Sequence, residues 1–156
     1  MRRVCITSIM CGFFLFCPKG YAADWVYFAK DNAGNYKFYD RTSISYLSQG
    51  TVTVWKKDVY SRQGIADYVA QRAKNNLSTF GYSELSHVVC KEELNCKTRE
   101  YRVLACTMYD KSGSVLEKQS ASNGHQAWEP AIPGSENDAF GKLICTLSPK
   151  KIKKKK

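Results

Sequence analysis

The stretch Asn95-Cys-Lys-Thr-Arg-Glu-Tyr-Arg-Val-Leu-Ala-Cys-Thr-Met-Tyr109 holds the strongest strand signal in the chain. Its later half is apolar on both faces, because Val103 and Ala105 point to one side of a strand and Leu104 to the other. A strand that is apolar on both sides lies inside a sheet and is covered on both faces. The stretch therefore predicts a central strand, with the helices of the chain as its two covers.

Five further segments carry the β-branched and aromatic residues that are typical of strands. They are Trp25–Lys30, Tyr36–Tyr39, Thr51–Tyr60, Leu85–Leu94 and Ser114–Ser120. Turn residues separate them, as in Asp31–Asn35, and Asp40 and Ser43 are suited to bond nearby backbone amides in a tight turn. These patterns predict an α+β fold with an antiparallel sheet of about six strands.

Two segments predict helices instead. In Gly64–Asn75 the apolar residues Ile65, Val69 and Ala73 recur every four positions, which indicates one apolar stripe. The last helix begins after Pro133-Gly134, where Ser135 is a good N-cap and Asp138 stands three residues later, as in a capping box. The expected apolar stripe of that last helix is Phe140, Leu143 and Ile144, and Cys145 stands in its last turn.

Residues 1–22 have the features of a secretory signal peptide. Two arginines precede the apolar run Val4–Phe16, which is too short to span a bilayer, and Gly20-Tyr21-Ala22 places small residues at positions −3 and −1 of a cleavage site. An uncleaved anchor and a lipoprotein are the alternatives. A lipoprotein needs a Cys after a small residue, whereas Cys11 follows a methionine and Cys17 a phenylalanine.

The chain is therefore expected to divide into three parts: a signal peptide at residues 1–22, one domain at 23–147, and a disordered lysine-rich tail at 148–156. The net charge of +10 includes three positive charges of the signal peptide and six tail lysines, so the domain itself carries only about +1. The tail lysines are Lys150, Lys151, Lys153, Lys154, Lys155 and Lys156. They are candidates for binding an anionic surface, and a solvated end is the alternative.

Four cysteines remain after export, an even number that predicts up to two disulfides. If the hairpin turns near Asn95–Lys97, Cys90 lies opposite a position about four residues before Cys106, on the order of 13 Å away. A bond between these two needs a bulge or a later turn, because bridged Cα atoms lie within about 7 Å. Cys96 stands at the turn itself, and Cys145 of the last helix is its natural partner; unpaired thiols are the alternative.

Catalytic motifs are scarce. The two histidines, His87 and His125, fall in a strand and in a polar loop, and the chain has none of the common hydrolase, zinc-protease or phosphate-loop motifs. Cys90 and Cys96 have five intervening residues, more than zinc pairs usually have. We therefore predict no catalytic residues, no metal ligands and no cofactor. The aromatic residues are best interpreted as core, with Trp25, Trp55 and Trp128 as an alternative ligand-binding face.

A set of short motifs, in order along the chain, resembles the bacterial surface-adhesin protein E family. They are Trp25-Val26, Phe38-Tyr-Asp40, Ser43-Ile44, Val52-Thr-Val-Trp55, Leu94-Asn-Cys96, Tyr101-Arg-Val-Leu104, Trp128-Glu-Pro-Ala-Ile-Pro-Gly-Ser135 and Leu143-Ile-Cys145. The resemblance implies a six-stranded antiparallel sheet with the last helix held on its concave face by a disulfide, and Cys96 and Cys145 occupy the matching positions.

The named member of that family is an outer-membrane lipoprotein adhesin that binds host matrix and plasma proteins and dimerises. This chain has no lipoprotein cysteine and adds Cys90 and Cys106. We expect a non-enzymatic protein-interaction or adhesion module in the periplasm or on the outer cell surface. Its expected partners are a protein ligand or an anionic cell-surface component, and a second copy of the chain, but no specific nucleic acid. A soluble periplasmic protein that binds or inhibits another envelope component is the alternative.

Overall fold

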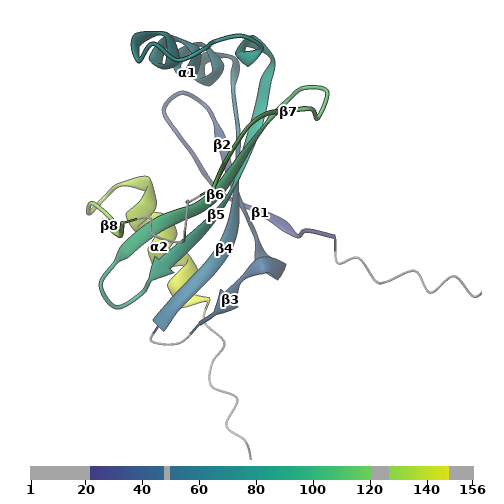
Figure 1. Ribbon diagram of the computed structural model, residues 1–156. Helices are drawn as coiled ribbons and strands as arrows, with labels where there is room; N and C mark the ends of the chain where they lie inside the picture. Colours follow the sequence, from purple (N-terminus) through teal and green to yellow (C-terminus); the bar gives the residue numbers. More distant parts are fainter. Residues whose placement is uncertain (1–21, 48–49, 121–126, 148–156) are drawn as a thin grey trace, which may run out of the picture.

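A computed structural model describes residues 22–47, 50–120 and 127–147, and one antiparallel sheet forms its body (Figure 1). Six strands follow one another across the sheet in chain order: β1 (Trp25–Lys30), β2 (Tyr36–Asp40), β4 (Thr51–Val59), β5 (Leu85–Asn95), β6 (Glu100–Asp110) and β7 (Val115–Ser120). Two short strands lie beside them, β3 (Ser45–Tyr46) against β4 and β8 (Glu129–Pro130) against β6. The six-stranded antiparallel sheet is confirmed, and the two short strands were missed because two residues show no period.

Two helices accompany the sheet, α1 (Arg62–Lys74) and α2 (Glu136–Thr146). The hydroxyl of Ser61 caps α1 by accepting from the Gly64 N–H at 2.9 Å. Ser135 caps α2 as predicted, since its hydroxyl accepts from the Asp138 N–H at 3.2 Å. The Asp138 carboxylate accepts from the Gly134 N–H instead of the Ser135 N–H, which is a variant of the expected capping box.

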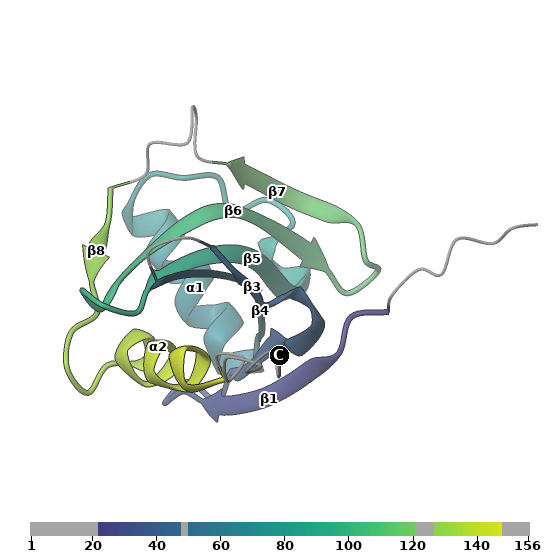
Figure 2. The same cartoon turned by 90° about the horizontal axis from the view of Figure 1, so that it is seen from below.

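Helix α2 lies on the inner face of the sheet, which curves around it (Figure 2). Phe140 and Ile144 have no exposed surface, and they pack against buried residues of β2, β4 and β5. These sheet residues are Tyr39, Val52, Val54 and Leu94. The Phe140 ring also stacks on Phe28, with 4.7 Å between ring centroids. The predicted stripe of α2 therefore forms the core, which lies between this helix and the sheet.

Both disulfides form. Cys96 and Cys145, whose Cα atoms are 5.7 Å apart, join the β5–β6 turn to the last turn of α2. Cys90 and Cys106 are direct cross-strand partners on β5 and β6 and form the second bond. Two features that the sequence left open bring them together. The turn lies later than expected, so that Asn95 pairs with Glu100, and a bulge between Lys91 and Glu92 shifts the register by one more residue.

The prediction that β6 is covered on both faces was wrong. Every residue of β6 is only partly buried, and the fully buried positions of the sheet lie on β2, β4 and β5. Helix α1 lies near one end of the sheet while α2 covers the inner face nearer the other end (Figure 1), so α1 contacts β6 only near the end of that strand, where the Tyr68 hydroxyl lies 3.2 Å from the Met108 sulfur. Among the described residues, no helix lies on the outer face of the sheet (Figure 2).

The predicted stripe of α1 was also only partly right. Ile65 and Val69 are half-buried, but Ala73 is exposed. The packed side of the helix includes Tyr68, whose ring lies 5.8 Å from that of Tyr82. Residue Arg72 continues this side, with its guanidinium 3.8 Å above the Tyr82 ring and bonded to Glu117 of β7. An arginine that packs on an aromatic face cannot be found by counting apolar residues.

Gly64 allows the first turn of α1 to pack directly on the β1–β2 turn. A Cβ atom at this position would lie 2.6 Å from Asn35 Cγ, and Asn35 cannot move aside because it bonds to both Asp31 and Ser61. Ser61 strengthens the same contact by donating from its hydroxyl to the Ala33 carbonyl at 2.5 Å. The position therefore requires a residue without a side chain.

We expect Gly64→Ala to lower the free energy of unfolding by about 1–3 kcal/mol, the usual cost of overpacking. Gly141→Ala is the matched control, because Gly141 stands inside α2 with open space around its Cα. That control should raise stability by about 1 kcal/mol through helix propensity alone. Urea unfolding of both variants measures the difference, and equal effects would contradict the packing described for Gly64.

Removing the disulfide between Cys96 and Cys145 should cost more stability than removing the one between Cys90 and Cys106. The first closes a loop with a sequence separation of 49 and the second one of 16. In the loop-entropy model this difference amounts to about 1 kcal/mol, on a usual loss of about 2–5 kcal/mol for either bond. Urea unfolding of the two double Cys→Ala variants tests the order, and a larger loss for the Cys90 and Cys106 pair would contradict it.

Candidate binding surfaces

The outer face of the sheet, which we call the open face, is the first candidate surface. Side chains alternate along a strand, and Val52 and Val54 point inward to α2, so Trp55 and Lys57 of the same strand point outward. The cross-strand register then places a continuous row on the open face. It runs through Tyr27, Phe38, Lys57, Val89, Thr107 and Lys118. A second row pairs Trp55 with Lys91, and a third pairs Tyr36, Val59, His87 and Tyr109.

Aromatic rings and lysines are interleaved on the open face. The ammonium group of Lys57 lies 4.3 Å from the centre of the Trp25 ring and 5.4 Å from that of Phe38. The edge strand β1 and its neighbour β2 carry Tyr27 and Tyr36, which are 53% and 45% exposed. Cation–π contacts hold the lysine in place while the neighbouring rings remain accessible to solvent.

The lysines of the open face have no carboxylate partners among the described residues. The ten ion pairs found there do not include Lys57, Lys91 or Lys118. The nearest acid on this face of β5, Glu93, is bonded to Arg102 at 2.5 Å. The Trp128 ring lies 4.5 Å from that guanidinium. The centre of the open face therefore has a net positive charge, although the domain as a whole is nearly neutral.

His87 also lies on the open face and is stacked on Tyr109, with 4.9 Å between the ring centres. Burial and the nearby Lys57 lower the pKa of His87, so its ring is neutral at pH 7. Its Nδ1 lies 3.2 Å from the hydroxyl of Ser86. His125 lies outside the described residues. In the described ranges, no group of three or more His, Cys, Asp or Glu side chains is arranged to hold a metal ion.

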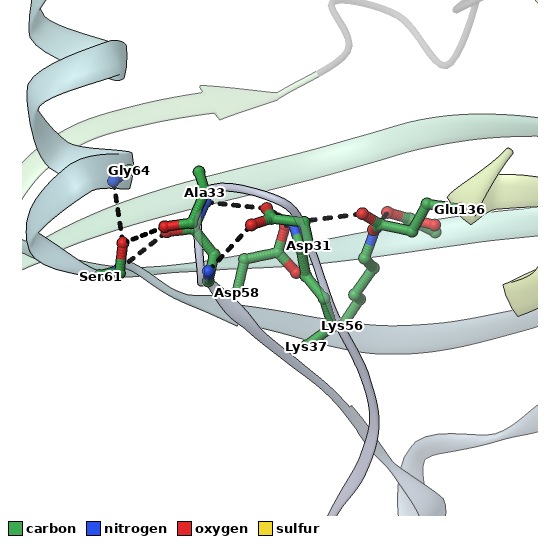
Figure 3. A network of polar contacts seen from close by, with 10 residues as sticks. Asp31, Ala33, Lys37, Lys56, Asp58, Ser61, Gly64 and Glu136 are labelled. Atoms are coloured by element: carbon green, nitrogen blue, oxygen red, sulfur yellow. Dashed lines mark hydrogen bonds and ion pairs between the residues drawn. The ribbon is translucent and has the colours of Figure 1, made fainter.

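The inner face carries a network of largely buried ion pairs, and Figure 3 shows it between Glu136 of α2 and the hydrogen bonds that Ser61 makes at the start of α1. Lys37 of β2 lies 2.8 Å from Asp58 of β4 and 3.4 Å from Glu136, the first residue of α2. Lys56 of β4 lies 2.8 Å from the same Glu136 and 3.6 Å from Glu92 of β5. Glu136 stands in the first turn of α2, where a carboxylate also interacts favourably with the helix dipole, and it binds two strands at once.

The ionisation of this network is strongly perturbed. Burial alone would lower the pKa of Lys56, but Glu92, Asp58 and Glu136 surround it and raise its pKa overall. Burial raises the pKa of Glu92, and Asp58 and Glu136 add to this effect, although Lys56 opposes it. One oxygen of Glu92 and one of Asp58 are buried without a hydrogen-bond partner in the described part of the chain. Glu92 is therefore the member of the network whose charged form is least well satisfied.

A small cleft of about 240 Å³ lies beside the disulfide of Cys96 and Cys145, and it is the second candidate surface. Its walls come from α2 and from the β5–β6 turn, with Leu94 and Tyr101 among its apolar lining. Gly141 leaves the helix side of the cleft open. The charged groups at the cleft include Lys142, which is bonded to the buried Asp138 at 2.7 Å. Two basic residues, Arg99 and Lys142, and two acidic residues, Glu100 and Asp138, line the cleft, so its charges balance and we assign it no ligand.

All three tryptophans proposed as an alternative ligand face project on the outer side of the sheet: Trp25 beside Lys57, Trp55 opposite Lys91, and Trp128 beside Arg102. The lysines of the open face were missed, because only the cross-strand register brings them together. The tail lysines lie outside the described residues, and so does the proposed signal peptide apart from Ala22.

Comparison with known proteins agrees with this architecture. The family model described as surface-adhesin protein E matches residues 25–146. The chain belongs to the surface-adhesin protein E family. No curated protein and no solved structure matched the chain. Membership of an adhesin family, together with the two disulfides, indicates a surface-adhesin-like, exported protein. Over the residues that the structure describes, no helix is long and apolar enough to cross a membrane.

We expect Glu92→Gln to change how stability depends on pH. Because the pKa of Glu92 is raised in the folded state, the folded protein retains this proton more strongly than the unfolded chain. The stability of the wild type therefore falls as pH rises from the ordinary glutamate pKa of 4.5 through the raised pKa of Glu92, by at most about 1.4 kcal/mol per pH unit from this group.

A glutamine side chain does not titrate. The free energy of unfolding of Glu92→Gln, taken relative to that of the wild type, should therefore rise with pH over the same window. Urea unfolding at several pH values measures the difference, in which the other titrating groups largely cancel. Asp67→Asn is a suitable control, since Asp67 lies exposed on α1 away from the ion network. A difference between wild type and Glu92→Gln that is constant with pH would contradict the raised pKa.

Proposed function

We propose that the chain is an exported, non-enzymatic adhesion module that binds its partner through the open face. The observation that carries the proposal is that, within the described part of the chain, no helix covers this face and it combines exposed rings with lysines that lack an ion-pair partner. Aromatic residues are enriched at protein interfaces, and exposed apolar patches of this kind mark interaction sites. Family membership supports the same class of function.

The rest of the fold is suited to presenting such a surface. The two disulfides, the ion network and the core under α2 all lie on the inner face or at the ends of the sheet. Substitutions on the open face therefore leave the core contacts intact. A rigid surface loses little conformational entropy on binding, which favours affinity.

A soluble periplasmic protein that binds or inhibits another envelope component is the second candidate. The predicted signal peptide at residues 1–22 and the disulfides fit both candidates equally well. The two differ only in location. Protease treatment of intact cells distinguishes them, because the protease reaches an adhesin on the outer surface and leaves a periplasmic protein intact. We expect the chain to be removed; its survival beside an equally protected periplasmic marker would contradict adhesion.

Binding itself is tested with the purified, exported chain and host cells. We expect the double variant Tyr27→Ser/Tyr36→Ser to reduce attachment to the cells by roughly tenfold, as is usual when exposed interface aromatics are lost. Phe80→Ser is the matched control, since Phe80 is 93% exposed in a loop outside the open face. Attachment that is equal in all three proteins would contradict a role for the open face.

A further inference from the structure

The open face carries three lysines, Lys57, Lys91 and Lys118, that have no ion-pair partner among the described residues. Lys57 and Lys118 belong to one cross-strand row, with Val89 and Thr107 between them, and so they lie three strand spacings apart, roughly 14 Å. Lys91 stands two residues from Val89 on β5, in the neighbouring row. Three cations spread over this distance match an extended chain of repeated negative charges better than a single small anion.

Flat apolar rings lie next to these cations. Trp55 is the direct cross-strand partner of Lys91, and Phe38 is that of Lys57. Tyr27 continues the Lys57 row to the edge of the sheet with half of its surface exposed. An aromatic ring offers a flat apolar surface to the C–H groups of a sugar ring, while the lysines bind the charged substituents.

From this juxtaposition we propose that the open face binds an acidic polysaccharide. Lys57, Lys91 and Lys118 bind its carboxylate or sulfate groups, and Trp55 and Tyr27 stack on its sugar rings. The proposal rests on the proposed adhesion function and names the chemical class of the partner. Single-stranded nucleic acid also combines negative charge with flat rings, but it lies in grooves of its binding proteins, whereas this face is convex. The disulfides also indicate an exported protein.

The orientation of Lys57 supports this assignment. Its ammonium group is held between Trp25 and Phe38, so its position is set before any ligand arrives. The open face also offers no competing carboxylate in its central rows, which run through β2, β4, β5 and β6. A polyanion therefore meets an ordered set of cations and does not displace an existing ion pair.

Heparin, a sulfated polysaccharide, is the probe for the test, and the full exported chain is used throughout. We expect Lys57→Gln/Lys91→Gln to raise the Kd for heparin roughly tenfold, the effect of losing two exposed charge contacts. The matched control is Lys74→Gln/Lys97→Gln, which removes the same charge from two exposed lysines outside the open face. An equal loss in both double variants would mean that binding follows net charge, and the proposal would be wrong.

Two further arms separate the parts of the proposal. Trp55→Leu should weaken binding of heparin but leave binding of inorganic polyphosphate, which has no ring to stack, unchanged; equal effects on both probes would contradict the stacking role. Deleting residues 148–156 removes the tail lysines from every variant. The loss of heparin affinity caused by Lys57→Gln/Lys91→Gln should persist after this deletion. If that loss disappears, heparin binds to the tail and not to the open face.

Competition completes the experiment. A single-stranded oligonucleotide that binds more tightly than heparin, with the same dependence on Lys57 and Lys91, would overturn the choice of polysaccharide. Failure of this inference can be told from failure of the adhesion function. Attachment to host cells that requires Tyr27 and Tyr36 but is insensitive to added heparin would leave adhesion standing with a different partner.

Discussion

Helix α2 is fixed to the inner face of the sheet at both ends, by a charge contact at one end and a covalent bond at the other. At its first residue, Glu136 binds Lys37 and Lys56 on neighbouring strands, and at its last turn Cys145 is bonded to Cys96. Between these two points the helix buries its apolar stripe in the curve of the sheet. Most of the buried apolar residues belong to this contact, and Tyr82, Leu85 and Val88 are buried outside it, so the sheet depends on α2 for the larger part of its core.

The same contact explains why the other face is available for binding. An antiparallel sheet needs a cover on only one side, and the second side can remain in water. The acids near the centre of the sheet are occupied on the inner face or by Arg102, whereas Lys57 and Lys91 on the open face have no acidic partner in the described residues. The separation of ion pairs on the inner face from partly buried, unpaired lysines on the open face creates a positive surface on a nearly neutral domain.

The local pattern of the chain was sufficient for most elements. Ser135 caps α2, the alternation in Thr51–Val59 matches its two faces, and the apolar stripe of α2 is the core. Predictions failed where the deciding partner is distant in sequence. The apolar pattern of β6 suggested covers on both sides, but the position of α1 depends on how Gly64 packs on the β1–β2 turn.

The sequence by itself determined the class of the fold, the even cysteine count and the family, because strand and helix periods and cap residues are read from neighbours along the chain. Only the tertiary structure decided that Cys90 pairs with Cys106, because the bulge beside Lys91 brings them opposite each other. It also decided which lysines share a face of the sheet. The reason is physical: one extra residue in a strand changes every cross-strand partner beyond it, and no local pattern records that shift. The open face is a product of this register.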